Sequence, residues 1–145
     1  MINAYLYERH GWARKELEKT FQQTKEAHKL DIMMQCTTGD SDELYKCIVK
    51  NAKQPSIYII SVLASKSGID LAKRIRAFDP KGQIIILLSL NALKAFFPDK
   101  VRPLGYVHVK ITILSLIFPA FSLRKMKPQL IELMLKAYDN LKKRK

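Results

Sequence analysis

The sequence predicts an α/β domain built on an open, parallel β-sheet. Short runs of apolar, β-branched residues alternate along the chain with longer stretches in which apolar residues recur at helical spacing. Five strands and five helices of this kind fit into 145 residues, a length typical of one domain. Strands that alternate with helices in this way form parallel sheets covered by helices. We therefore expect a single domain over residues 1–145.

The first half of the chain predicts two strands and two helices. Residues 4–7 (AYLY) form the first apolar run. The face of an amphipathic helix follows, carrying Ala13, Leu17, Phe21, Thr24 and His28. Residues 31–36 (DIMMQC) predict the second strand. Asp40 and Glu43 have the spacing of a capping box, so we expect a second helix to begin there. Its inward positions are Leu44, Cys47 and Ile48.

The third and fourth strands are the clearest in the sequence. Residues 56–63 (SIYIISVL) and 83–89 (QIIILLS) are continuous apolar runs, as expected of strands that are buried on both faces. The helix between them is expected to begin at Ser67-Gly68 and to end at Asp79-Pro80.

Three more elements are expected after the fourth strand. Residues 92–97 predict a short helix, and residues 106–110 predict a fifth strand. Pro128 suits the first position of a last helix. The apolar positions of this helix are Ile131, Met134, Leu135, Tyr138 and Leu141. The helix runs into a basic tail, so that residues 128–145 form a basic C-terminal helix and tail.

The chain is strongly basic. It has 26 Lys and Arg residues against 13 Asp and Glu residues, which gives a net charge of +13. Much of the excess lies in residues 124–145, and Lys73, Arg74 and Arg76 share one predicted helix. This excess indicates an anionic partner or surface, although a charge run is usually a solvated face. No helix-turn-helix, zinc finger or aromatic RNA-binding sheet is recognisable, so the charge alone supports only non-specific contact with phosphates.

Cysteine usage and hydropathy indicate a cytoplasmic protein. Cys36 and Cys47 are too few for a disulfide framework, and no apolar leader precedes a cleavage site. The most apolar stretch, residues 111–121 (ITILSLIFPAF), is interrupted by Pro119. A membrane-spanning helix needs about 20 apolar residues, so we expect no membrane segment.

The sequence offers no recognisable catalytic or metal centre. His10, His28 and His108 lack the spacing of metal ligands. The glycines form neither a phosphate-binding loop nor a dinucleotide-binding fingerprint, and no serine lies in a G-x-S-x-G elbow. We therefore expect no enzymatic activity, no metal and no cofactor.

One stretch resembles a known family. Residues 58–89 contain GIDLAKRIR (residues 68–76), then Asp79-Pro80 and the strand QIIILLS. This stretch resembles the middle of receiver domains of LytTR-type response regulators, which control quorum sensing, bacteriocin production or competence in Gram-positive bacteria. The resemblance implies two-component signal transduction, transcription regulation and a flavodoxin-like receiver fold, with a five-stranded parallel sheet of order 2-1-3-4-5 flanked by helices.

Members of this family carry a C-terminal DNA-binding domain, and this chain ends where that domain would begin. The resemblance therefore leaves two expectations open. The chain is part of a longer regulator, or it is a stand-alone adaptor.

The resemblance also places a phosphorylation pocket at the carboxyl ends of the strands. Such pockets hold carboxylates that bind Mg²⁺, and one of these carboxylates accepts the phosphoryl group. The equivalent positions here are Glu8, Arg9, His10, Ser61, Leu88 or Ser89, and Lys110. Glu8 is the only carboxylate among them, and the acceptor aspartate falls on Ser61. The set is neutral or cationic, so we expect a vestigial pocket that neither binds Mg²⁺ nor takes up phosphate.

A long apolar segment separates the fifth strand from the last helix. The family joins these elements within a few residues, whereas residues 111–126 intervene here. One domain rarely exposes so much apolar surface, so this segment is a candidate interface for self-association or for a protein partner. The residues expected to form the interface are Leu114, Leu116, Ile117, Phe118 and Phe121.

Two functions from different classes follow. The first is a pseudo-receiver, a phosphorylation-independent response-regulator domain that acts through protein contacts or as a homodimer. The alternative is a basic α/β module that binds nucleic acid or another polyanion directly. The expected polyanion contacts are Lys142, Lys143, Arg144 and Lys145.

Overall fold

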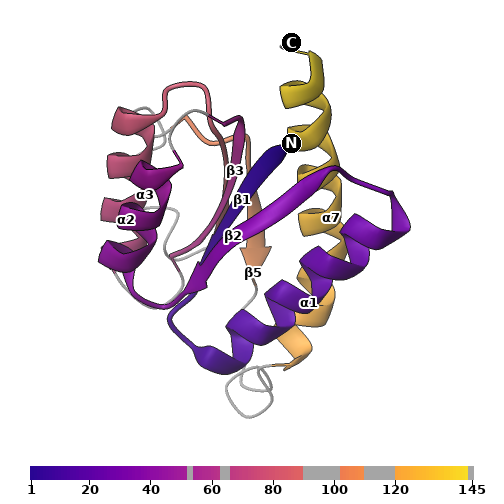
Figure 1. Ribbon diagram of the computed structural model, residues 1–145. Coiled ribbons are helices and arrows are strands. Elements are labelled where there is room, and N and C mark those ends of the chain that lie inside the picture. Colours follow the sequence, from indigo (N-terminus) through magenta and orange to yellow (C-terminus); the bar gives the residue numbers. More distant parts are fainter. Residues whose placement is uncertain (52–53, 63–65, 90–101, 110–119, 144–145) are drawn as a thin grey trace.

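The computed structural model describes residues 1–51, 54–62, 66–89, 102–109 and 120–143. Strands and helices alternate along most of this part of the chain (Figure 1). In chain order, the elements are β1 (Ile2–Tyr7), α1 (Gly11–Ala27), β2 (Ile32–Thr38), α2 (Ser41–Lys50), β3 (Ser56–Ser61), α3 (Lys66–Phe78), β4 (Gln83–Ser89), β5 (Gly105–Val109) and α7 (Ala120–Lys143).

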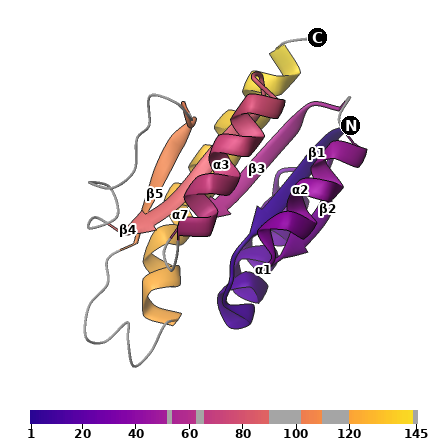
Figure 2. The ribbon, with the colours of Figure 1, turned by 90° about the vertical axis from the view of Figure 1, so that its left-hand side faces the viewer.

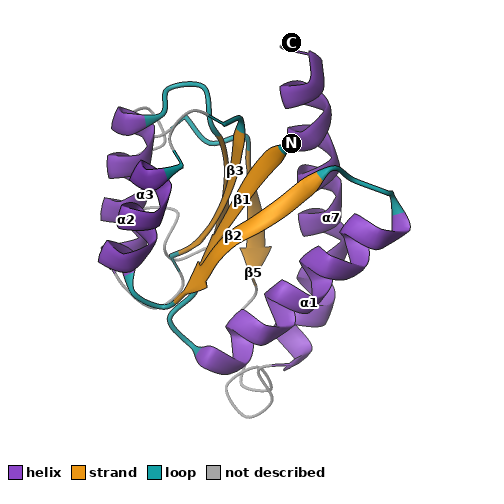
Figure 3. Ribbon diagram, in the orientation of Figure 1, coloured by secondary structure: helices purple, strands orange, loops and turns teal. Residues whose placement is uncertain are grey.

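The strands form one parallel sheet with helices on both faces. The order of the strands is β2-β1-β3-β4-β5. Each neighbouring pair is parallel. Helices α2 and α3 cover one face, and α1 and α7 cover the other (Figures 1, 2 and 3). The expectation of an open parallel sheet flanked by helices is confirmed.

Two hydrophobic cores follow from the alternation of side chains along the strands. On β1, Ala4 and Leu6 pack with α1 and α7, whereas Tyr5 and Tyr7 pack with α2 and α3. β1 and β3 are buried along their whole length, in agreement with their largely apolar sequences. Their polar residues Asn3, Ser56 and Ser61 are buried as well. β2 is an edge strand and is only partly buried, as its mixed sequence allows.

The start of α2 modifies the predicted capping box. Asp40 is the N-cap, and its Oδ1 accepts from the backbone N–H groups of Asp42 (2.9 Å) and Glu43 (3.2 Å). In a simple capping box, the Glu43 side chain would accept from the backbone N–H of Asp40. Here the hydroxyl of Thr38 intervenes: it accepts from Asp40 N (3.1 Å) and donates to Glu43 Oε2 (3.1 Å).

The expected start of the last helix is wrong. α7 begins at Ala120, so Pro128 lies inside this helix rather than at its first position. A proline within a helix removes one backbone hydrogen bond and costs about 3 kcal/mol. Pro128 is exposed, while Met126 and Leu130 on either side of it are buried in the α1–α7 core. Burying such side chains contributes about 1.5–3 kcal/mol each, which offsets the cost.

The other predicted elements differ from the structure mainly at their ends. β2 continues to Thr38, and β3 ends at Ser61. The predicted helix at residues 92–97 lies outside the described residues, and so does Lys110, the last residue of the predicted fifth strand.

A pair of buried tyrosines ties β1 and β3 to the turn before β4. The rings of Tyr5 and Tyr58 stack with centroids 5.3 Å apart. The Tyr58 hydroxyl donates to Asp79 Oδ2 (2.7 Å), whereas the buried Tyr5 hydroxyl makes no hydrogen bond to the described residues. Gly82 allows this arrangement, because a Cβ there would lie 2.4 Å from the Tyr58 ring and 2.7 Å from Asp79 Oδ2.

Candidate functional site

The described positions of the predicted vestigial pocket lie along one edge of the sheet, where parallel strands end. β1, β2 and β3 end at Tyr7, Thr38 and Ser61, and we call this edge the carboxyl edge. In the register of the sheet, Tyr7 pairs with Thr38 and Ser61 pairs with Leu87. Ligands of open α/β sheets bind at this edge, close to the point where the strand order reverses.

Glu8 is buried directly after β1, with 2% of its surface exposed. Its backbone N–H donates to the carbonyl oxygen of Thr38 (3.1 Å). Its carboxylate oxygen Oε1 accepts from the backbone N–H of His10 (3.1 Å). Glu8 therefore holds the turn between β1 and α1 with its own side chain, while the neighbouring Arg9 and His10 are exposed.

A cation that the sequence analysis missed, Arg14, lies at the same turn. Its Nη1 donates to the carbonyl oxygen of Glu8 (2.9 Å). The same nitrogen would lie 2.7 Å from a Cβ at Gly39, so the glycine leaves room for the guanidinium between the turns that follow β1 and β2. The carboxyl edge thus carries a cation that is held by the main chain of Glu8.

Ser61 occupies the end of β3 and is 6% exposed. By alternation it lies on the face of Ile57 and Ile59, which packs against α1 and α7. α3 begins close to this strand end, because a Cβ at Gly68 would lie 2.4 Å from the Ser61 carbonyl oxygen. The hydroxyls of Tyr7 and Ser67 are hydrogen-bonded and join the end of β1 to the first turn of α3.

The structure therefore brings Glu8 and Ser61 to one edge and adds Arg14, Thr38 and the Tyr7–Ser67 bridge. Of the remaining predicted pocket residues, Ser89 is the last residue of β4 and pairs with Val109, and its side chain lies outside the described residues. Lys110 lies outside them altogether. No sequence motif marks Arg14 or Thr38, since their roles depend on two turns that meet only in the folded chain.

The chemistry available at this edge is limited in the part of the chain that the structure describes. No group of three His, Cys, Asp or Glu side chains there could hold a metal ion. Cys36 is a poor nucleophile, because burial and the neighbouring Cys47 raise the pKa of its thiol to about 11. Ser61 has a buried hydroxyl, and serine needs an adjacent base to attack phosphorus at neutral pH.

The predicted interface and the basic tail are described only in part. Leu114, Leu116, Ile117 and Phe118 lie outside the described residues, as do Arg144 and Lys145. Phe121 lies in the first turns of α7, and its side chain is not described. Met126, the last residue of the apolar segment, is buried in the α1–α7 core.

Lys142 and Lys143 are exposed at the end of α7, and Lys142 Nζ lies 5.4 Å from the ring centroid of Tyr138. None of the described helices combines the length and the apolar character that a membrane span requires.

Comparisons with known proteins show a likeness in fold. No protein-family model matches the chain, and no curated protein matches it in sequence. Among solved structures, a response regulator receiver domain protein from Clostridium thermocellum matches with a TM-score of 0.61 and 13% identity. The match covers 92% of this chain and 99% of that one.

Two further structures match to a similar extent. The receiver domain of AraT, a response regulator from Geobacillus stearothermophilus, has a TM-score of 0.58 and 12% identity, covering 90% of this chain and 95% of that one. RcsB from Salmonella enterica, solved bound to the promoter rprA with a beryllofluoride phosphomimetic, has a TM-score of 0.58 and 19% identity. The latter match covers 94% of this chain and 68% of that one. Identities this low establish the receiver fold alone.

Proposed function

We propose that this chain is a pseudo-receiver, a receiver-fold domain of a LytTR-type response regulator that passes on a signal without being phosphorylated. The observation that carries the proposal is the composition of the carboxyl edge. Among the described residues at the family's pocket positions, Glu8 is the one carboxylate; it is buried and accepts a hydrogen bond from the turn that follows it. Ser61 stands at the end of β3, and the guanidinium of Arg14 lies beside Glu8.

This composition disfavours phosphoryl transfer for two physical reasons. Mg²⁺ requires hard oxygen ligands and is usually held by more than one carboxylate or by a carboxylate and phosphates. Glu8 already accepts from His10 N, and the nearby Arg14 cation would repel a second cation. In addition, a serine hydroxyl is a much weaker acceptor of a phosphoryl group than an ionised carboxylate is.

Signal transfer would then depend on contact with a protein partner or with a second copy of the chain. We propose residues 111–126 as this contact, with Leu114, Leu116, Ile117, Phe118 and Phe121 as its apolar residues. We place the protein in the cytoplasm of a bacterium, in transcription regulation, and assign no enzymatic activity and no cofactor to it. Light scattering of the full chain at rising concentration tests the homodimer; a strict monomer at high concentration contradicts it.

The phosphorylation-independent state is tested by an NMR titration with Mg²⁺ and beryllofluoride. For the wild type we expect no saturable change in the backbone resonances of residues 6–10 and 58–62. The variant Arg9→Asp/His10→Asp/Ser61→Asp serves as the matched control, because it restores carboxylates at the family's positions. Saturable shifts in the wild type at these residues would contradict the proposal, whereas shifts in the variant alone would support it.

The basic surface favours one alternative, direct binding to a polyanion. The observation behind it is the net charge of +13, together with Lys142 and Lys143 exposed at the end of α7. Part of the charge is already used, because Arg74 pairs with Asp42 (2.9 Å) and Arg76 is buried. Binding to labelled duplex DNA at two salt concentrations separates the two functions. Tight binding that falls steeply with salt and is lost on deleting residues 142–145 would favour the alternative.

A further inference from the structure

The two cysteines of the chain lie on the same face of the sheet. Cys36 is on β2 and Cys47 is on α2, the helix that covers this face together with α3 (Figure 1). Both are free cysteines, and both are half-buried against the core beneath α2 and α3. The shared core keeps the two side chains on one side of β2, while their partial exposure lets a small reagent reach them from solvent.

A bulge in β2 brings Cys36 to this face. Met34 packs against the opposite core, beneath α1 and α7. In a regular strand, the residue two positions later would lie on that same face. Gln35 is an extra residue in the register, so Cys36 pairs with Tyr5 and packs beneath α2 instead. Without the bulge, the sheet would separate the two thiols.

The thiol of Cys47 reaches the backbone of Cys36. Cys47 Sγ donates to the carbonyl oxygen of Gln35 at 3.9 Å, and this oxygen belongs to the peptide group that joins Gln35 to Cys36. The thiols also affect each other, because burial and the neighbouring Cys47 raise the pKa of Cys36 to about 11. The packing of α2 on β2 therefore holds the two sulfur atoms as neighbours.

The hydrogen bonds of Cys47 Sγ are weak enough for this sulfur to turn. Asn51 Nδ2 donates to the carbonyl oxygen of Cys47 at 2.9 Å, whereas it lies 3.9 Å from Cys47 Sγ. The bond from Cys47 Sγ to Gln35 is equally long. Thiols are weak donors and weak acceptors, and bonds of this length contribute little. Little is therefore lost when the sulfur turns toward Cys36.

We propose that Cys36 and Cys47 form a reversible intramolecular disulfide that locks α2 onto β2. The oxidant is a low-molecular-weight disulfide, such as oxidised glutathione. The thiolate of Cys47 attacks one sulfur of the oxidant and releases one thiol, and the thiolate of Cys36 then attacks Cys47 Sγ and releases the second thiol. The two cysteine protons pass to the released thiolates, and the oxidant gains two electrons.

The order of attack follows from the surroundings of Cys36. Its raised pKa leaves little thiolate at neutral pH, so it reacts slowly with a reagent from solution. Its attack on Cys47 is intramolecular, and a neighbouring group acts like a very high concentration of thiol. Disulfides inside cells are usually transient and respond to the redox state. The pair fits such a redox-sensitive contact, which does not depend on the proposed signalling role.

Oxidation of the full, folded chain with oxidised glutathione tests the proposal. After incubation at neutral pH, unreacted thiols are blocked with N-ethylmaleimide and the intact mass is measured. We expect the oxidised chain to lose two hydrogen atoms and to carry no maleimide. Trypsin cleaves after Lys46 and so separates the cysteines. Residues 30–46 and 47–50 should be found as one disulfide-linked pair, which a reductant separates.

A matched variant keeps two cysteines and changes where the second one lies. Cys47→Ser/Val49→Cys moves the thiol to an exposed position two residues further along α2, and it should form no internal disulfide. Cys36→Ser leaves Cys47 without a partner, so it should stop at one glutathione adduct per chain. Oxidation of the wild type should also raise its urea midpoint by about 1 M, because the bond restricts the unfolded chain.

Four results would overturn the proposal. The wild-type chain could stay reduced, carry a glutathione on each cysteine, or form disulfide-linked dimers in place of the internal bond. Alternatively, the Cys47→Ser/Val49→Cys variant could form an internal disulfide as readily as the wild type does. This last result would show that chain flexibility, and not the packing of α2 on β2, brings the thiols together. The wild-type measurements decide the proposal even if a variant fails to fold.

Discussion

Replacing Tyr58 by Phe and, separately, Tyr5 by Phe removes one hydroxyl from each member of the stacked pair. The two rings are equally buried in the α2–α3 core and differ in what their hydroxyls contact. The Tyr58 hydroxyl donates to Asp79 Oδ2 at 2.7 Å, and the Tyr5 hydroxyl is buried with no hydrogen bond to the described residues. The pair therefore isolates the contribution of one buried hydrogen bond to the fold.

The magnitudes follow from these contacts. A hydrogen bond to a charged group contributes about 1.5–3 kcal/mol, and Asp79 is half-buried, so water can replace part of the lost bond. We expect Tyr58→Phe to lower the free energy of unfolding by about 1.5–2 kcal/mol. Tyr5→Phe removes a buried hydroxyl that forms no hydrogen bond with the described residues. We therefore expect the free energy of unfolding to stay the same or to rise by up to about 1 kcal/mol.

Urea unfolding followed by circular dichroism measures both changes. For Tyr58→Phe the midpoint should fall by about 1 M with an unchanged slope, since slopes for small proteins are about 1–3 kcal/mol per M. For Tyr5→Phe the midpoint should stay or rise. An equal loss of stability in the two variants, or no loss in Tyr58→Phe, would refute the assignment of the hydrogen bond to Tyr58 and Asp79.

Three more predictions concern the fold. Burial raises the pKa of Tyr5 from 10.0 to about 12, and burial with the neighbouring Asp79 raises the pKa of Tyr58. The folded chain thus keeps protons that the unfolded chain loses. In urea unfolding across pH 8–11, the raised pKa of Cys36 should lower the free energy of unfolding above pH 9, and the two tyrosines should lower it further above pH 10, each by about 1.4 kcal/mol per pH unit. Gly68→Ala should lower the free energy of unfolding by more than about 2 kcal/mol, because the new Cβ would lie 2.4 Å from a backbone oxygen of β3. Gly11→Ala should raise it by about 0.5–1 kcal/mol, because the nearest atom would be 3.6 Å from the new Cβ. Equal effects of the two variants on thermal unfolding would contradict this. Pro128→Ala should raise the melting temperature, because it restores a backbone hydrogen bond inside α7. An unchanged melting temperature would indicate a helix that begins at the proline.

The strands were predictable because burial on both faces leaves a direct mark on the sequence. Residues 57–60 and 84–88 form unbroken apolar runs inside β3 and β4. The start of α7 was not predictable, because the preference of proline for a first helical turn competes with the burial of Met126. Met126 is buried because α7 packs on the sheet, and the sequence pattern around Pro128 carries no information about that contact.

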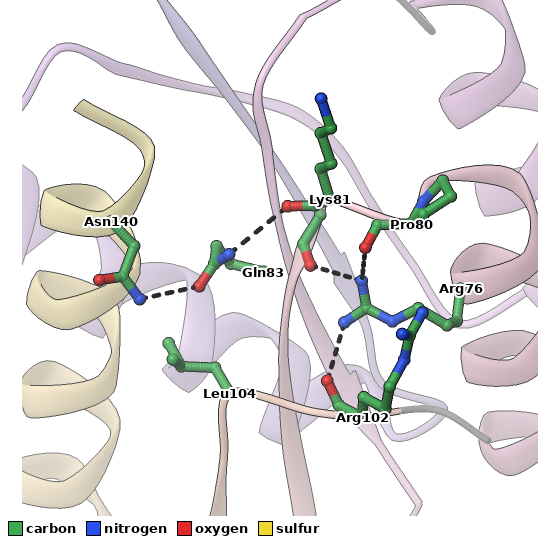
Figure 4. A pocket seen from close by; sticks show the side chains of 8 residues that line it. Arg76, Pro80, Lys81, Gln83, Arg102, Leu104 and Asn140 are labelled. Carbon is green, nitrogen blue, oxygen red and sulfur yellow. Dashed lines mark hydrogen bonds between the residues drawn. The ribbon is translucent and has the colours of Figure 1, made fainter. Parts of the chain in front are cut away.

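The residues of the candidate site also differ in how far the sequence could predict their positions. Glu8 and Ser61 could be placed at one edge through the family resemblance, which assigns them to the ends of the first and third strands. The position of Arg14 could not, since it depends on the space that Gly39 leaves in another turn. Arg76 was counted with Lys73 and Arg74 in the basic excess of one helix. Its burial could not be predicted, because the turn to β4 supplies the carbonyl oxygens that bind the guanidinium (Figure 4).

The central claim, a receiver fold that does not accept a phosphoryl group, is tested most directly by intact-protein mass spectrometry. The full chain is incubated with acetyl phosphate and Mg²⁺, beside the variant Arg9→Asp/His10→Asp/Ser61→Asp. We predict no phosphoryl adduct on the wild-type chain, because Glu8 is the one carboxylate among the described residues at the family's pocket positions, and it is buried. A wild-type mass gain of one phosphoryl group, mapped to Ser61 or to Glu8, would contradict the account.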